Sequence, residues 1–110
     1  MTDRLTQLFR FLDLDPTDAF TRYSIAYEYR QLAQWALAAE HFEALLAQHP
    51  NYVGAYYHLG HTYLRLKELD KATQIFNAGI EYARKNNDAH AQSELRNALT
   101  NLELGLDLED

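Results

Sequence analysis

The sequence predicts an all-α protein, an α-solenoid of repeated helix pairs. With four glycines and two prolines in 110 residues, it contains few residues that interrupt helices, and periodic apolar stretches fill the intervals between them. A spacing of 34 residues separates the two prolines and relates further residues of similar type: Tyr23 and Tyr57, Ile25 and Leu59, Tyr29 and Tyr63, Ala38 and Ala72, Phe42 and Phe76. Repetition at a fixed period of this length is typical of stacked helical repeats.

Each repeat divides into two helices. Repeat one covers residues 17–50: Asp18 is the predicted N-cap of a helix at 18–31, and a turn at residues 33–34 leads to a second helix at 35–48. That helix ends before Pro50, because a residue that precedes proline avoids the helical region. Repeat two covers residues 51–84, with helices at 52–65 and 69–84. Small residues at the expected helix crossings allow close packing: Ala26, Ala38, Gly60 and Ala72.

The two ends of the chain are predicted to cover the repeats. Residues 3–14 form an extra N-terminal helix, which buries a leucine stripe against the helix at 18–31. After a polar break, residues 88–104 form a C-terminal capping helix with a polar outer face, as a terminal helix of a repeat array requires. A short acidic tail, residues 105–110, follows the glycine that is expected to end this helix. We expect a frayed tail; the alternative is that it docks on a neighbouring molecule.

The composition excludes several classes of function. The net charge is −6 at pH 7, and no basic patch of the kind that binds nucleic acid is visible. The absence of cysteine excludes disulfides, thiolate zinc sites and cysteine nucleophiles. The longest apolar run, residues 35–39, is too short for a membrane span, and the charged start of the sequence does not fit a signal peptide. We therefore expect a cytoplasmic protein that binds neither nucleic acid nor membrane and carries no cofactor.

Residues able to support catalysis or bind a metal are few. Ser24 and Ser93 are the only serines, and neither lies in a nucleophile-elbow or phosphate-loop sequence. His58 and His61 are three residues apart on one helix face, which suits a pair of metal ligands, but neighbouring positions supply no third ligand. We therefore predict no enzyme, no catalytic residue and no metal, and metal binding at this pair is only a lesser alternative. The other histidines are expected to face solvent: His41, His49 and His90.

The repeated motif resembles a known family. Repeat two reads Tyr56-x2-Leu59-Gly60-x2-Tyr63 and then Ala72-x3-Phe76, which is similar to the signature of the tetratricopeptide repeat. Repeat one carries a shorter version of the same pattern and closes at a proline, whereas Arg84 replaces the closing proline of repeat two. The resemblance implies a solenoid of two helix-turn-helix repeats that acts as a scaffold for other proteins.

The resemblance also implies a binding site. In such a stack the first helices of the repeats line a concave groove, and the candidate peptide-binding residues at groove positions are Phe20, Tyr23, Tyr27, Arg30, Tyr57, His58, His61 and Arg65. Tyrosine supplies contact area at low entropy cost, and arginine binds carboxylates. The alternative is that Tyr27 and Tyr57 pack between helices and that Arg30 and Arg65 are solvated helix ends.

These residues lead to expectations about the partner. We predict another protein or a peptide; a self-assembling subunit, such as a homodimer, is the alternative. The lysine and asparagine residues by which related repeats clamp an acidic chaperone tail are replaced here by Tyr23, Tyr27 and His58, so the resemblance does not imply that clamp. With an ordinary histidine pKa near 6.5, His58 and His61 are expected to make binding depend on pH near 6. Replacing Tyr23 and Tyr57 by alanine is expected to weaken binding with little effect on melting.

Overall fold

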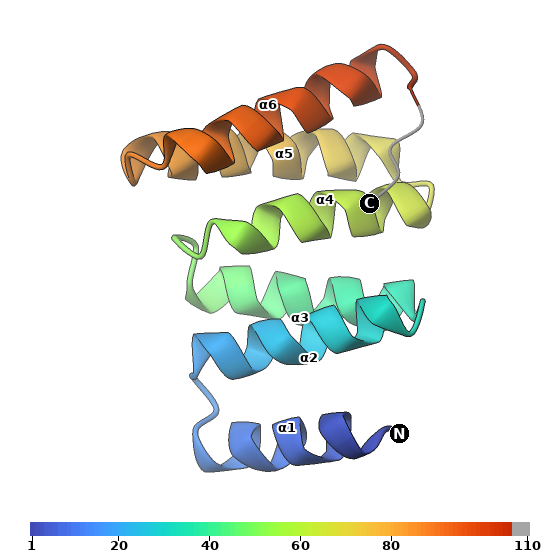
Figure 1. The fold of residues 1–110 in the computed structure, drawn as a ribbon, viewed down its shortest axis with the longest axis vertical. Coiled ribbons are helices and arrows are strands. Elements are labelled where there is room, and N and C mark those ends of the chain that lie inside the picture. Colours follow the sequence, from blue (N-terminus) through green and yellow to red (C-terminus); the bar gives the residue numbers. More distant parts are fainter. Residues whose placement is uncertain (107–110) are drawn as a thin grey trace.

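The computed structural model describes residues 1–106, and over this range the chain forms six α-helices stacked one above the other (Figure 1). The helices are α1 (Asp3–Leu14), α2 (Ala19–Gln31), α3 (Trp35–Gln48), α4 (Gly54–Arg65), α5 (Leu69–Lys85) and α6 (Ala89–Glu103). The predicted all-helical class is confirmed, and the helix bounds differ from those expected by two residues at most.

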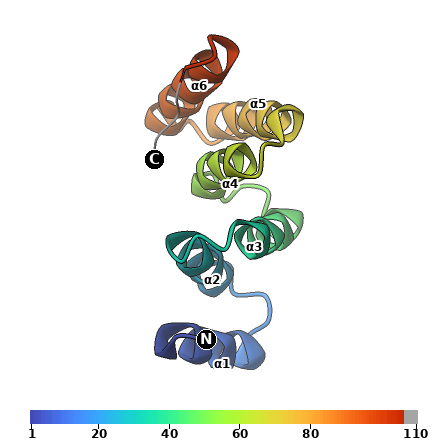
Figure 2. The ribbon, with the colours of Figure 1, turned by 90° about the vertical axis from the view of Figure 1, so that its right-hand side faces the viewer.

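The helices alternate between two sides of the stack. When the stack is seen from its side, α2, α4 and α6 lie on one side and α3 and α5 on the other (Figure 2). Each helix packs mainly against the helices next to it in sequence, and α4 also contacts both α2 and α6. The first helices of the two predicted repeats therefore share one layer, and their side chains can form a common surface.

Local hydrogen bonds set where the helices begin and end. The carboxylate of Asp18 accepts a 2.8 Å bond from the Thr21 amide and caps α2, as the sequence predicts. At the end of α2, Ala33 has a φ of 58°, and the amide of the following residue bonds back to the Tyr29 carbonyl at 2.9 Å. Lys67 repeats this turn after α4 with a φ of 62°. Both turns use a non-glycine residue in the left-handed region, which is uncommon.

Small residues let the helices of each repeat approach closely. Ala26 of α2 is fully buried, as are Ala38 and Phe42 of α3, the helix that packs against α2. In repeat two, α5 approaches α4 closely: a Cβ added to Gly60 would lie 2.2 Å from Cε1 of Phe76. Only glycine fits at this position without movement of the phenylalanine ring.

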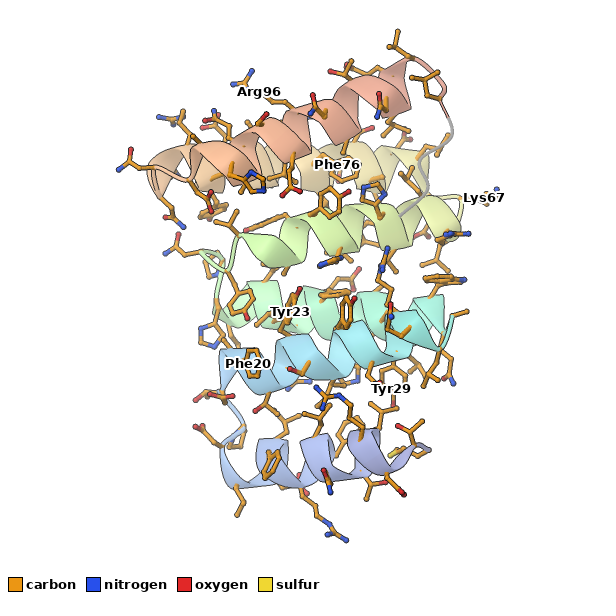
Figure 3. The ribbon with its side chains drawn as sticks, in the orientation of Figure 1. Phe20, Tyr23, Tyr29, Lys67, Phe76 and Arg96 are labelled. Atoms are coloured by element: carbon orange, nitrogen blue, oxygen red, sulfur yellow. The ribbon has the colours of Figure 1, made fainter. Side chains whose placement is uncertain are left out.

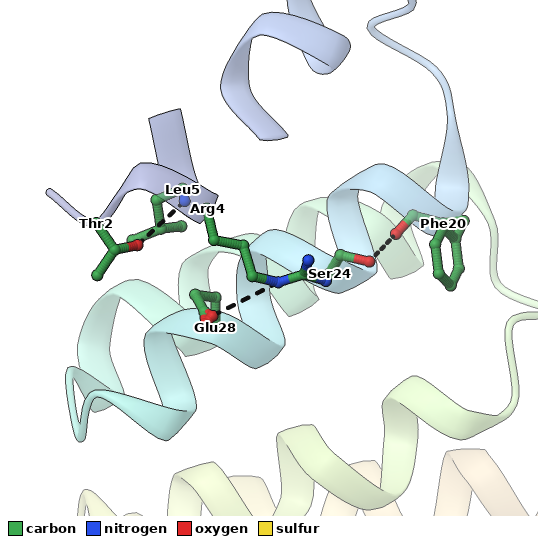
Figure 4. Close-up of polar contacts among 6 residues, drawn as sticks. All are labelled: Thr2, Arg4, Leu5, Phe20, Ser24 and Glu28. Carbon is green, nitrogen blue, oxygen red and sulfur yellow. Dashed lines mark hydrogen bonds and ion pairs between the residues drawn. The ribbon is translucent and has the colours of Figure 1, made fainter. Parts of the chain in front are cut away.

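The end helices complete the core. Leu5, Leu8 and Leu12 of α1 are buried, and a 3.7 Å ion pair between Arg4 and Glu28 joins α1 to α2 (Figure 4). Two further bonds in the same view stabilise the helices themselves: the Leu5 amide donates to the Thr2 hydroxyl, and the Ser24 hydroxyl donates to the Phe20 carbonyl. At the other end, Leu95 of α6 is buried close to Gly79 of α5.

Candidate functional site

Aromatic rings form a continuous surface over α2 and α4, which we call the aromatic face and define by Tyr23, Tyr27, Tyr57, His58 and His61. The ring centroids of Tyr23 and Tyr27 are 6.3 Å apart, and each ring also contacts His58 on the neighbouring helix, at 5.9 and 5.4 Å. On α4, Tyr57 lies 5.6 Å from His58 and 4.5 Å from His61. The 3.6-residue period of each helix brings these residues to one side, and the α2–α4 contact joins the two stripes.

The eight candidate residues lie at different depths. Phe20 and Tyr27 are 66% and 38% exposed, and Arg65 is also exposed. Figure 3 shows Phe20 and Tyr23 along α2. Tyr23, Tyr57 and His58 are half-buried and form a middle layer of the candidate set. Arg30 and His61 are buried, at 9% and 4% exposure, and lie beneath this layer.

Tyr23 has a larger packing role than the sequence suggests. Its ring contacts Phe42 of the core at 6.0 Å and Tyr52, in the segment before α4, at 5.2 Å. Because these contacts are lost in an alanine variant, we expect Tyr23→Ala to lower the melting temperature, which differs from the small effect expected from the sequence. Sequence reasoning also missed Tyr52 itself, which lies outside the helical period that defined the candidate set.

A positively charged edge borders the aromatic face at the C-terminal ends of α2 and α4. The guanidinium carbon of Arg65 lies 5.2 Å from the ring centroid of Trp35, a cation–π contact with the start of α3. Burial lowers the pKa of Arg30, and the nearby charge of Arg65 lowers it further. The alternative of two solvated helix ends therefore does not describe Arg30.

His61 is buried and His58 is half-buried, and the pKa of each lies well below the ordinary histidine value. Burial, followed by the charge of Arg30, lowers the pKa of both histidines to about 4. The expected change of binding near pH 6 is therefore wrong, because neither imidazole gains a proton in that range. Among the described residues, Nδ1 of His58 and both ring nitrogens of His61 are buried without a hydrogen-bond partner.

Two of the histidines expected to face solvent do not. His41 is half-buried between three helices: its ring stacks on Tyr29 at 5.5 Å, lies 5.7 Å from Phe9, and its Nδ1 is 3.2 Å from the Arg22 guanidinium. Burial lowers the pKa of His41, and the charge of Arg22 lowers it further. His49 is bonded to the Thr17 carbonyl at 2.8 Å.

Neither a cluster of metal-ligating side chains nor a membrane-spanning helix occurs in the described part of the chain. Residues 1–106 contain no group of three or more histidine, cysteine, aspartate or glutamate side chains placed to hold a metal ion. His58 and His61 thus remain a pair whose nearest ring neighbours are aromatic. Within the same residues, no helix has the length and apolar character needed to cross a membrane.

Comparison with known proteins identifies the class of this fold. The family model of the tetratricopeptide repeat matches residues 29–99, which is more than half of the chain. The chain belongs to the tetratricopeptide repeat family, as the resemblance of the two repeats indicates. No curated protein matches the chain.

Solved structures of tetratricopeptide repeat proteins have a similar fold. The solution structure of a tetratricopeptide repeat domain protein from Salinibacter ruber is 42% identical, with a TM-score of 0.75 over 81% of this chain and 90% of that one. The protein BPP2914 from Bordetella parapertussis, at 24% identity, has a TM-score of 0.82 over 96% and 91% of the two chains. The first tetratricopeptide repeat domain of Spaghetti (RPAP3), bound to an HSP90 peptide, is 21% identical with a TM-score of 0.78 over 92% and 75%. The last two likenesses concern the fold alone.

Proposed function

We propose that this protein is a non-enzymatic interaction module whose aromatic face forms a concave groove for a peptide segment or a helix of a partner protein. The observation that supports the proposal is the unbroken contact of aromatic rings across α2 and α4. Tyrosine is enriched at protein interfaces because its ring gives a large, stiff contact area and its hydroxyl still bonds to polar groups. The proposal places the protein in the cytoplasm.

The depths of the candidate residues suggest separate roles. Phe20, Tyr27 and Arg65 are exposed and would make the first contact with a partner. Tyr23 and His58 lie one layer deeper and would hold the exposed rings in place, because each contacts Tyr27. A surface that is ordered before binding loses less entropy when the partner arrives.

The family supports this use of the surface in general terms. The RPAP3 domain carries a peptide on the same fold. The residues here differ from the acidic-tail clamp of related repeats, with Tyr23, Tyr27 and His58 at positions where that clamp has lysine and asparagine. We therefore expect the aromatic rings of this chain, and not that clamp, to determine which partner it binds.

Selection from a library of random peptides tests the proposal. Peptides are selected on the natural protein, and their affinities are then measured for the Tyr27→Ala variant. We expect a loss of about tenfold, comparable with 1.4 kcal/mol. Phe11→Ala is the matched control, because Phe11 is an aromatic residue that is 55% exposed on α1, away from the aromatic face.

Two outcomes contradict the proposal. If Tyr27→Ala and Phe11→Ala reduce the affinity equally, or if neither variant reduces it, the peptides bind elsewhere. If no peptide is selected and the molecular mass rises with protein concentration in sedimentation, the alternative of a self-assembling subunit is correct.

A further inference from the structure

Helix α1 has the fewest neighbours of the six helices. It lies at one end of the stack (Figure 1), and within residues 1–106 its backbone lies against α2 alone, whereas every other helix lies against at least two. A cavity of about 530 Å³ separates the first turn of α1 from the α2–α3 turn, with Leu5 and Leu32 among its lining residues. Elements with few neighbours and incomplete packing open at a lower free energy than the rest of a protein. We therefore expect α1 to detach before the other helices unfold.

Three kinds of contact hold α1 in place. The first is the buried leucine stripe described above, and the second is the 3.7 Å ion pair between Arg4 and Glu28. The third is the ring of Phe9, whose centroid lies 6.4 Å from that of Tyr29 on α2 and 5.7 Å from that of His41 on α3. His41 therefore links α1 to α3, and its imidazole is titratable.

The surroundings of His41 require a neutral ring. Its Nδ1 lies 3.2 Å from the Arg22 guanidinium, and because a guanidinium only donates hydrogen bonds, this nitrogen accepts and the ring proton is on Nε2. Tyr29 stacks on the ring, and Phe9 meets it from α1. Burial, and then the charge of Arg22, lowers the pKa of His41, whereas the charge of Glu40 on the same helix raises it.

A second proton on His41 would disturb this arrangement in two ways. It would convert the acceptor Nδ1 into a donor facing Arg22, and it would place two positive charges side by side in a half-buried site. Detachment of α1 removes Phe9 from the ring and lets water hydrate the charged imidazole. The movement is confined to α1, because His49 of the α3–α4 segment is bonded to the Thr17 carbonyl at 2.8 Å and holds the start of α2.

We infer that the contact between His41 and Arg22 is an acid-sensitive latch for α1: protonation of His41 releases α1 from the stack and uncovers its leucine stripe together with the facing surface of α2. No residue of the aromatic face takes part, so the inference is independent of the proposed function. An imidazole with the ordinary pKa near 6.5 is stabilised by protonation about 25-fold more at pH 5 than at pH 7, which is the upper limit of the effect.

Amide hydrogen exchange of the full chain, followed by NMR at pH 7 and pH 5, tests the latch. After correction for intrinsic exchange rates, the opening constant of the amides of residues 8–12 should rise about tenfold at pH 5. In His41→Gln the side-chain carbonyl still accepts a bond from Arg22 but does not titrate, and the rise should be less than twofold. His90→Gln is the matched control, because it removes an exposed histidine from α6 and should leave the tenfold rise unchanged.

Two further variants identify the group responsible. Arg22→Gln keeps a donor for Nδ1 without the positive charge, and it should reduce the rise at least twofold. Glu28→Gln removes the other titratable side chain that holds α1, and it should keep the rise. If His41→Gln does not fold, Arg22→Gln decides the result, and an unchanged rise in that variant overturns the latch.

Three other results would overturn the inference. The first is an opening constant of α1 that is the same at both pH values. The second is a rise that persists in His41→Gln or disappears in Glu28→Gln, which would assign the effect to another group. The third is an equal opening constant for the amides of α1 and α5 at pH 5, which would show that the whole chain unfolds and that α1 is not released by itself.

Discussion

Helix α4 contains two glycines, Gly54 and Gly60, and replacing each by alanine tests how closely the helices pack. Gly60 lies under the ring of Phe76, and an added Cβ would come within 2.2 Å of the ring, whereas at Gly54 no atom lies within 4 Å of an added Cβ. Alanine is favoured over glycine in a helix by about 1 kcal/mol. A helix-propensity gain is therefore available at both positions, smaller at Gly54 because that residue begins the helix, and only Gly60 has a steric cost.

The expected changes in stability follow from these contacts. Overpacking a well-packed core costs about 1–3 kcal/mol, and the upper part of this range applies at Gly60 because Phe76 is fully buried and an added Cβ would meet three of its ring atoms. After the propensity gain, Gly60→Ala should destabilise the protein by about 1–2 kcal/mol. Gly54→Ala should stabilise it by up to about 1 kcal/mol, with the lower values applying because the position begins the helix.

Thermal unfolding followed by circular dichroism measures both variants. For a domain of this size, 1 kcal/mol corresponds to about 4 °C in Tm, so Gly60→Ala should lower Tm and Gly54→Ala should raise it slightly. In the double variant Gly60→Ala, Phe76→Leu, the smaller side chain makes room for the new methyl group, and the two changes should cost less than their sum. An increase in Tm for Gly60→Ala would refute the packing of α5 against α4 described above.

Three further predictions concern pH, turns and the aromatic face. His58 and His61 have a folded pKa of about 4, below the unfolded value near 6.5, so the unfolded chain binds more protons than the folded chain between pH 4 and 6.5. In urea titrations, the free energy of unfolding should therefore be constant above pH 7 and fall by roughly 2 kcal/mol per histidine between pH 6.5 and 5. Peptide affinity should stay flat from pH 5.5 to 8. Ala33→Gly should raise the free energy of unfolding by about 0.5–1 kcal/mol, because it relieves a positive φ; a loss of stability contradicts the turn geometry. Tyr23→Ala should cost about 2–3 kcal/mol because it loses core contacts, whereas Tyr27→Ala should cost about 1 kcal/mol or less, and equal costs would contradict their different burial.

The fold could be predicted from the sequence because one spacing controls it. The 34-residue period relates the buried residues Phe42 and Phe76, and the turn residues Ala33 and Lys67 have the same spacing. The left-handed conformation of those two turn residues could not be predicted, because neither is glycine and each is held by bonds to the preceding helix. Asp18, in contrast, was predicted as a cap from a local rule that does not depend on distant contacts.

The candidate site could be predicted only in part. Helical periodicity assigns a residue to a face of its helix but does not give its depth, so Arg30 and His61 were expected on the surface and are buried. The low pKa values of the histidines depend on burial by neighbouring helices and on the charge of Arg30, which lies 28 residues before His58 in the chain. His41 is covered by residues from α1 and α2, which no local pattern relates to it.

The central claim is that a partner segment binds across α2 and α4 at the aromatic face. The most direct test is an amide NMR titration of the labelled protein with the tightest peptide from the random library. We expect the shifts to concentrate around Tyr27, Tyr57 and Arg65 and to be absent from the outer surfaces of α3 and α5. Shifts confined to α3 and α5, or to the exposed side of α1, would contradict it.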